Sequence, residues 1–232
     1  MTLHNYNPWP LGMIPQDKQR YELEHLKGMG YSFSNPWEIV DIFENKVAKF
    51  SGSKFAVAVD CCSHGIFLCL KYLKATGKIT IQKQTYISVP MQIIHAGCEV
   101  QFEDLKWTGM YQLRPYPIFD SAVRWSKNMY EGGFQVVSFQ IKKTVPIGRG
   151  GMILTDDAES VAWLKKARYD GRDLSLPYPE NIITSIGWHY YMTPEDAARG
   201  IILMDATPDV NKDIGNWNNY PDISNQIVFN GK

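Results

Sequence analysis

The sequence predicts a single α/β domain in which helices flank a largely parallel sheet. Its 232 residues are 44% hydrophobic and 13% aromatic, which is enough for a substantial core. Short apolar runs with strand character alternate along the chain with segments of helical periodicity. Such alternation is typical of parallel sheets wrapped by helices.

The first half of the chain contains two predicted helices and three predicted strands. Apolar residues recur at spacings of three and four over residues 37–50, which predicts an amphipathic helix. A strand is predicted directly afterwards at 55–59, followed by a helix at 66–73. Two more strands are predicted at 78–81 and 99–102.

The second half continues the alternation and then loses it. Strands are predicted at 117–120, 135–139 and 152–155, and a helix at 156–167. Thr193 and Pro194 predict the capped start of another helix, which runs to residue 204. Residues 206–232, called the C-terminal arm below, are rich in Asn, Asp and Pro and are predicted to be irregular.

Composition and charge exclude several classes of function. The 24 basic and 24 acidic residues balance, so a nucleic-acid partner is not expected. No apolar run reaches the roughly 20 residues that cross a bilayer, and the first residues do not resemble a leader peptide. The four cysteines include no Cys-x-x-Cys pair, so we expect reduced thiols, no metal site and a cytoplasmic protein.

A lysine and an aspartate are the candidate catalytic residues. Lys143 lies between an apolar strand that ends near Ser138 and a glycine-rich turn that ends at Met152. Asp120 ends another apolar run, and the amine and the carboxylate therefore follow two predicted strands. Pyridoxal phosphate needs a lysine that forms a Schiff base with its aldehyde and a buried carboxylate that keeps its ring nitrogen protonated. Lys142 is the alternative lysine.

The run from Ser138 to Met152 resembles the hallmark of the DegT/DnrJ/EryC1/StrS family of pyridoxal-phosphate-dependent sugar aminotransferases. Lys143 falls on the family's Schiff-base lysine, Ser138 on a serine that contacts the cofactor phosphate, and Asp120 on the partner of the ring nitrogen. The resemblance implies the large domain of a fold-type I pyridoxal-phosphate-dependent transferase over residues 1–205. It extends from about Pro15 to the end of that range.

The resemblance also implies further cofactor contacts, with three departures from the family pattern. Ser63 keeps the hydroxyl of the phosphate-binding threonine at a helix start, but Cys62 replaces the usual glycine. Tyr86 would stack on the pyridine ring, and Val123 replaces a glutamine near it. His189 replaces an asparagine that reaches the phosphate in the neighbouring subunit. Taken alone, these residues could equally be a helix cap, core side chains and a loop histidine.

Together these features predict an aminotransferase that moves an amino group from an amino acid, expected to be glutamate, to a keto-sugar, expected to be nucleotide-linked. A homodimer with shared active sites follows from the match at His189. A pyridoxal-phosphate enzyme of another reaction type, such as a dehydratase, is an alternative. So is a degenerate homologue that acts as an interaction subunit. Retention of Lys143 favours transamination, because a histidine there would indicate dehydration.

The resemblance does not include the small C-terminal domain of the family. We expect the C-terminal arm to pack across the dimer and to replace part of that domain, the alternative being a frayed tail. Its expected anchors are apolar or aromatic: Trp217, Tyr220, Ile223 and Phe229.

Overall fold

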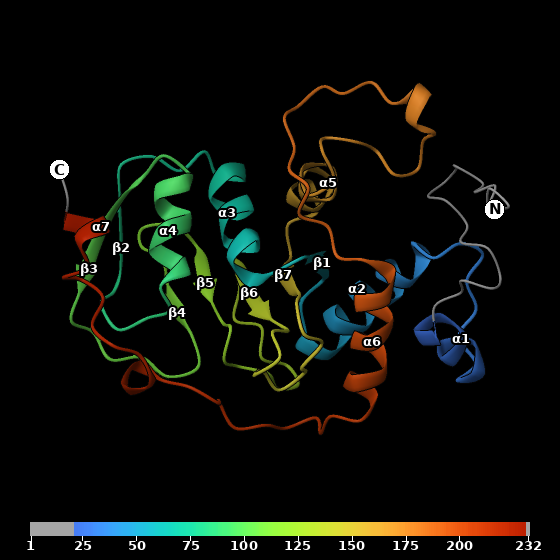
Figure 1. Ribbon diagram of the computed structural model, residues 1–232, viewed down its shortest axis with the longest axis horizontal. Helices are drawn as coiled ribbons and strands as arrows, with labels where there is room; N and C mark the ends of the chain where they lie inside the picture. The colour runs from blue at the N-terminus through green and yellow to red at the C-terminus, as the bar shows by residue number, and fades with distance from the viewer. Residues whose placement is uncertain (1–20, 231–232) are drawn as a thin grey trace, which may run out of the picture.

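The computed structural model describes residues 21–230 as an α/β fold with a five-stranded sheet and a separate two-stranded sheet (Figure 1). The start of the family resemblance at Pro15 and the last two residues of the C-terminal arm lie outside the described residues. The strands are β1 (Phe55–Val59), β2 (Lys78–Gln82), β3 (Glu99–Glu103), β4 (Tyr111–Gln112), β5 (Ile118–Asp120), β6 (Phe134–Ser138) and β7 (Gly151–Thr155). The helices are α1 (Tyr21–Gly28), α2 (Glu38–Ser51), α3 (Cys62–Tyr72), α4 (Ser88–His95), α5 (Ala158–Ala167), α6 (Pro194–Asp205) and α7 (Ile227–Asn230), with short 3-10 turns at Tyr178–Glu180 and Trp217–Asn219.

The sheet is mixed, so the prediction of a largely parallel sheet is wrong. The strand order is β1-β7-β6-β5-β4, and only β5 and β6 pair in parallel within it. β7 lies antiparallel between β1 and β6, which leaves β1, β5 and β6 running in the same direction. Alternation of helices and strands predicted β7 but not its direction, because a loop rather than a helix joins it to β6. The carboxyl ends of β1, β5 and β6 consequently meet at one edge.

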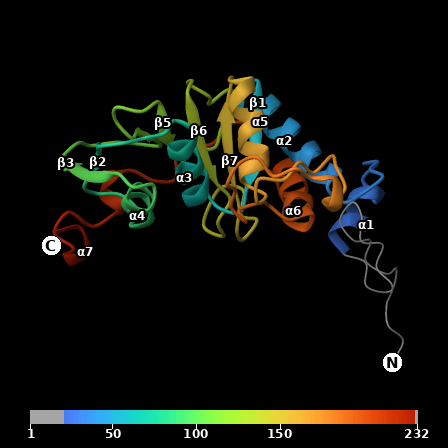
Figure 2. The same ribbon diagram turned by 90° about the horizontal axis from the view of Figure 1, so that it is seen from above.

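Two hydrophobic cores cover the two faces of the sheet. Helices α3, α4 and α5 pack with the two-stranded sheet on one side, whereas α1, α2 and α6 pack on the other. Figure 2 shows β2 and β3 at one end of the molecule and α1 at the opposite end. Helix α3 lies directly against the central strands, because a Cβ at Gly65 would meet Val136 at 2.7 Å.

The helix starts follow from capping side chains. Thr193 caps α6 by accepting the Asp196 N–H at 3.2 Å, as predicted, and Asp157 caps α5 by accepting the Glu159 N–H at 3.0 Å. Helix α3 begins at Cys62, four residues before the predicted start at 66, because Cys61 serves as its cap. Helices α1 and α4 were not predicted.

The C-terminal arm packs against its own chain. It leaves the end of α6, crosses the molecule and ends at α7 beside β3 (Figure 1). All four expected anchors contact residues of the same chain: the Trp217 N–H donates to the Trp107 carbonyl, the Ile223 N–H donates to the Lys83 carbonyl, and the Phe229 ring packs on Phe102. Tyr220, the fourth, packs on Trp107. The arm is therefore ordered within one chain rather than a frayed tail. Its expected packing across a dimer stays a prediction.

Candidate active site

Asp120 is a buried carboxylate whose hydrogen-bond partners are neutral. It ends β5 with 6% of its surface exposed. It accepts hydrogen bonds from the Ala122 N–H at 3.0 Å and the Tyr111 hydroxyl at 2.9 Å, with the Cys62 thiol at 3.9 Å. Burial raises the pKa of Asp120 above its ordinary value, although these donors oppose the shift. Among residues 21–230, no lysine or arginine forms an ion pair with it.

Of the two candidate lysines, Lys143 is the one whose charge acts on Asp120. It lies in the loop between β6 and β7 and is half-buried, with its backbone N–H bonded to the Gln140 carbonyl at 2.8 Å. Its positive charge acts on both Asp120 and Cys62 and lowers their pKa values against the larger effect of burial. Lys142 is exposed, and its backbone N–H bonds to the Gln140 side chain instead. The amine and the buried carboxylate therefore meet at the edge where β5 and β6 end.

The start of α3 meets the same edge. Its first residue, Cys62, is buried and points its thiol toward Asp120 and the Val136 carbonyl, and burial followed by Asp120 raises the pKa of that thiol. Gly151 makes this approach possible, because a Cβ there would lie 2.5 Å from the Cys62 nitrogen. Backbone N–H groups at a helix start attract anions, so this end of α3 could hold a phosphate.

Two hydroxyls flank that helix start. Ser63 shares a hydrogen bond of 2.7 Å with Ser88, the first residue of α4. Ser138 ends β6 opposite Gly151, and its hydroxyl accepts the Gln140 N–H at 3.3 Å. Strand ends and helix starts thus bring Cys62, Ser63, Asp120, Ser138 and Lys143 to one edge of the sheet.

The remaining three predicted contacts are placed differently. The Tyr86 side chain precedes α4 and is 58% exposed. Val123 is buried three residues after β5, where its carbonyl accepts the Ile214 N–H of the C-terminal arm. His189 lies on an outer loop, where its ring bonds to Asp170 at 2.8 Å and packs on Tyr191. With 66% of its side chain exposed, His189 is open to a second subunit.

The structure adds a charged cluster that the sequence did not reveal. Asp60 pairs with His64 at 2.7 Å through one oxygen and with Arg149 at 2.7 Å through the other. Burial alone would lower the pKa of His64, but the bonds with Asp60 and Cys61 raise it to about 9. His64 also stacks on Tyr190 with 3.6 Å between ring centroids. The i,i+4 spacing of Asp60 and His64 was the available signal, but the strand–helix junction between them hid it.

This cluster also contains atoms that could bind a cation. Ligand atoms of Asp60, Cys61 and His64 lie within 4.8 Å of one another. Both oxygens of Asp60 already pair with cationic groups, however, so the arrangement is better described as an ion-pair network at the start of α3.

The arrangement fits pyridoxal phosphate. A ring nitrogen that carries a proton would supply the positive charge that the hydrogen-bond partners of Asp120 lack. Cys62 and Gly151 form a close-fitting strand–helix junction for the phosphate, and Lys143 provides the amine.

Comparisons with known proteins identify similar sequences and similar folds. The model of the DegT/DnrJ/EryC1/StrS aminotransferase family matches residues 22–116. The resemblance to this family is confirmed. A curated relative, the spore coat polysaccharide biosynthesis protein SpsC of Bacillus subtilis (strain 168), is 31% identical over 105 residues, which cover 44% of this chain and 26% of SpsC.

Solved structures, an aminotransferase among them, share the fold. AtS13 from Actinomadura melliaura has a TM-score of 0.67 at 20% identity, covering 79% of this chain and 63% of AtS13. DesI, solved with its TDP-sugar product, has a TM-score of 0.62 at 21% identity, covering 82% of this chain and 58% of DesI. PseC from Helicobacter pylori, an aminotransferase involved in the biosynthesis of pseudoaminic acid, has a TM-score of 0.62 at 16% identity and covers 81% of this chain and 63% of PseC.

These matches confirm the α/β class and the fold. The chain spans roughly three fifths of the length of these solved structures and about a quarter of the curated relative. Within residues 21–230, each helix is too short or too polar to cross a membrane.

Proposed function

We propose that the protein is a pyridoxal-phosphate-dependent aminotransferase that transfers an amino group from an amino acid to a keto-sugar. The observation that carries this proposal is the buried Asp120 carboxylate, whose hydrogen-bond donors among residues 21–230 are neutral and whose pKa, raised by burial, is lowered by the nearby charge of Lys143. The family match and the fold of sugar aminotransferases support it. We propose glutamate as the amino donor and a nucleotide-linked sugar as the acceptor.

Each residue of the site has a distinct part in this proposal. Bound pyridoxal phosphate would supply an electron sink for the transfer of an amino group. Asp120 would hold the proton on the ring nitrogen, while Tyr111 and the Ala122 N–H keep the carboxylate oriented. The Lys143 amine would hold the cofactor aldehyde and then move a proton at the reacting carbon as general acid and base.

The other residues would position the cofactor. The N–H groups at Cys62 and Ser63, with the Ser63 and Ser138 hydroxyls, would bind the phosphate. Tyr86 would stack on one face of the ring and Val123 would bound it on the apolar side. Residues 1–205 would then be the pyridoxal-phosphate-binding domain, and the C-terminal arm a separate addition to it.

We also propose a cytoplasmic homodimer with shared active sites. The free thiols of Cys61, Cys62, Cys69 and Cys98 are in keeping with a reducing compartment. The exposed His189 would reach the phosphate of the partner's cofactor, since its ring projects from an outer loop. Two-fold symmetry is the commonest arrangement of soluble oligomers.

Subunit mixing tests the shared site. An inactive Lys143→Ala chain mixed with an inactive His189→Ala chain should recover one intact site per heterodimer. Native mass spectrometry would verify that subunits exchange, and turnover would be compared with that of each parent. Exchange without recovery of activity would mean that each site is built from one chain.

Spectroscopy tests the function itself. Addition of pyridoxal phosphate to the purified protein should produce a visible absorbance band, and glutamate should then abolish that band. Addition of a nucleotide-linked keto-sugar should restore it with formation of an amino sugar. A band that persists with every amino donor would favour another reaction type, and the absence of any band would favour a non-catalytic subunit.

A further inference from the structure

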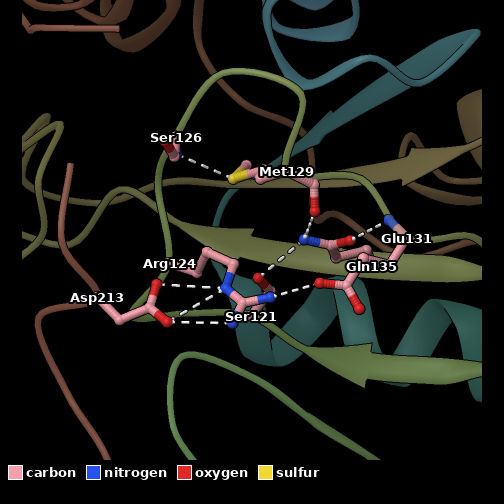
Figure 3. Close-up of polar contacts among 7 residues, drawn as sticks. All are labelled: Ser121, Arg124, Ser126, Met129, Glu131, Gln135 and Asp213. Carbon is pink, nitrogen blue, oxygen red and sulfur yellow. Dashed lines mark hydrogen bonds and ion pairs between the residues drawn. The ribbon is translucent and has the colours of Figure 1, made fainter. Parts of the chain in front are cut away.

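The C-terminal arm is fastened to the loop that follows Asp120. Asp213 of the arm accepts hydrogen bonds from Arg124 at 3.1–3.3 Å, and Arg124 also pairs with Glu131 at 2.7 Å (Figure 3). The next residue of the arm, Ile214, donates its N–H to the Val123 carbonyl at 2.9 Å. The loop that follows Asp120 is also held to β6, because the buried Gln135 side chain donates to the Ser121 hydroxyl at 3.0 Å (Figure 3).

The arm then runs beside residues 107–111, which include Tyr111, the hydroxyl donor to Asp120. The Gly109 N–H donates to the Gly215 carbonyl at 3.1 Å, and the Trp217 N–H donates to the Trp107 carbonyl at 3.0 Å. The indole N–H of Trp107 in turn donates to the Gln84 carbonyl at 2.8 Å, two residues before Tyr86. The arm is therefore held to both segments that lead into the candidate site.

Tyr220 is the arm residue that these hydrogen bonds place beside the candidate site. Its ring packs on Trp107 with 5.6 Å between centroids, and Trp107 packs on Tyr111 at 4.9 Å. Tyr111 donates to Asp120, so a continuous aromatic wall leads from the arm to the buried carboxylate. Asp120, Cys62 and Tyr86 are the groups whose electrostatic effect reaches the Tyr220 hydroxyl. Burial, followed by these groups, raises the pKa of Tyr220 to about 12, so its phenol keeps its proton.

The arm is fastened again beyond Tyr220. The Gln84 side chain donates to the Tyr220 carbonyl at 3.5 Å, and Asp222 pairs with Lys83 at 3.2 Å. Ile223 is 3% exposed and donates its N–H to the Lys83 carbonyl at 3.0 Å. Anchors on both sides of Tyr220 fix its backbone, so its placement beside the site is not that of a loose terminus.

We propose that Tyr220 is a further cofactor-contact residue, brought by the C-terminal arm to form the wall of the site between Asp120 and Tyr86. The inference rests on the proposed function, because the ligand it names is the ring of pyridoxal phosphate. An aromatic ring in this place contacts the cofactor ring and excludes water from the Asp120 carboxylate. Residue 220 lies beyond residues 22–116, the part that matches the family model, so the arm supplies a contact that this match does not describe.

Binding of pyridoxal phosphate measured by absorbance tests this assignment without reference to turnover. Tyr220→Ala should weaken the apparent affinity roughly tenfold, in line with the loss of one aromatic contact. Tyr220→Phe should stay within about threefold of the wild type, because the ring carries the contact. Tyr21→Ala, at a tyrosine that is 89% exposed on α1, is the matched control and should bind as the wild type does.

A second measurement on the wild-type protein covers the case in which Tyr220→Ala fails to fold. Saturation with pyridoxal phosphate should reduce hydroxyl-radical oxidation at Tyr220 and leave oxidation at Tyr21 unchanged. Unchanged oxidation at Tyr220, unchanged affinity in Tyr220→Ala, or tighter binding in that variant would each overturn the inference. Tighter binding would mean that Tyr220 obstructs the site. A wild-type protein that binds no pyridoxal phosphate would instead overturn the proposed function, and this inference with it.

Discussion

Two buried carboxylates of this protein have opposite surroundings. Glu44 of α2 is 3% exposed and is bonded to Arg168, to Lys165 at 2.9 Å and to the Ala58 N–H at 2.8 Å. Asp120 is 6% exposed and is bonded to neutral donors. A buried carboxylate is stable when cations compensate it, as at Glu44. Among residues 21–230 no cation is hydrogen-bonded to Asp120, and we propose that a positively charged ligand takes that place.

Glu44 also links several elements on the face of the sheet that α2 covers. Its carboxylate joins α2 to β1 through Ala58 and to the end of α5 through Arg168, whose guanidinium also donates to the Ala58 carbonyl at 2.6 Å. Every partner of this carboxylate is part of the chain, so Glu44 is compensated without a ligand. Both carboxylates are buried, but Glu44 has a structural role, whereas we propose a functional role for Asp120.

Of the variants described here, one that neutralises Glu44 should lower the free energy of unfolding most. A small change in that free energy would contradict the comparison of Glu44 with Asp120. Glu44→Gln leaves the Arg168 charge buried without its counter-ion, which should lower the free energy of unfolding by about 3–5 kcal/mol. Urea unfolding of the cofactor-free protein measures this. Asp41→Asn removes an exposed partner of the same Lys165 and should cost less than about 1 kcal/mol. Equal effects of the two variants would show that Glu44 is not the structural carboxylate described here.

The same kind of change at Asp120 should spare the fold and damage the reaction. Asp120→Asn cannot hold a positive ring nitrogen, so we expect turnover to fall by roughly a hundredfold or more. The free energy of unfolding of the cofactor-free protein should be unchanged or higher, because an uncompensated buried charge is removed. Asp104→Asn, at an exposed acid, serves as the control. Near-normal turnover would remove Asp120 from the site.

The Asp60–His64 pair, which is less buried than either carboxylate, sharpens the comparison through its pH dependence. The pKa of His64 is raised to about 9, so its protonated form favours the folded state. That stabilisation is complete below about pH 6.5 and is lost as the pH rises through about 9. The stability difference between wild type and His64→Gln should therefore shrink over this window, by about 1–2 kcal/mol after solvent screening.

Unfolding at a series of pH values measures this effect. His95→Gln, at an exposed histidine that ends α4, should follow the wild-type profile. A flat difference between wild type and His64→Gln would mean that the Asp60 pair contributes nothing to stability.

Local patterns in the sequence singled out the candidate site residues, but they did not reveal how the strands pair. Asp120 and Lys143 each follow an apolar strand, and motif spacing singled out both. The cap at Thr193 also gave the start of α6. The position of β7 between β1 and β6 depends on contacts between distant segments, and no local period reports it. Helix α4 is short and contains Pro90, which obscured its pattern.

Tyr220 shows the same limit within the site. It lies 100 residues from Asp120 in the sequence, in a segment without regular periodicity. Anchors on both sides of it, such as Asp213 and Ile223, hold it against the aromatic residues that lead to the carboxylate. The sequence identified Tyr220 as an anchor of the C-terminal arm but did not reveal the surface on which it packs.

Covalent labelling tests the central claim, that Asp120 and Lys143 form a site for pyridoxal phosphate, most directly. The protein would be saturated with the cofactor, reduced with borohydride, digested and mapped by mass spectrometry. The account predicts a phosphopyridoxyl group on Lys143, whose charge lowers the pKa of the buried Asp120 carboxylate against the larger effect of burial, and none on the exposed Lys142. A label on Lys142, or no label at all after saturation, would contradict it.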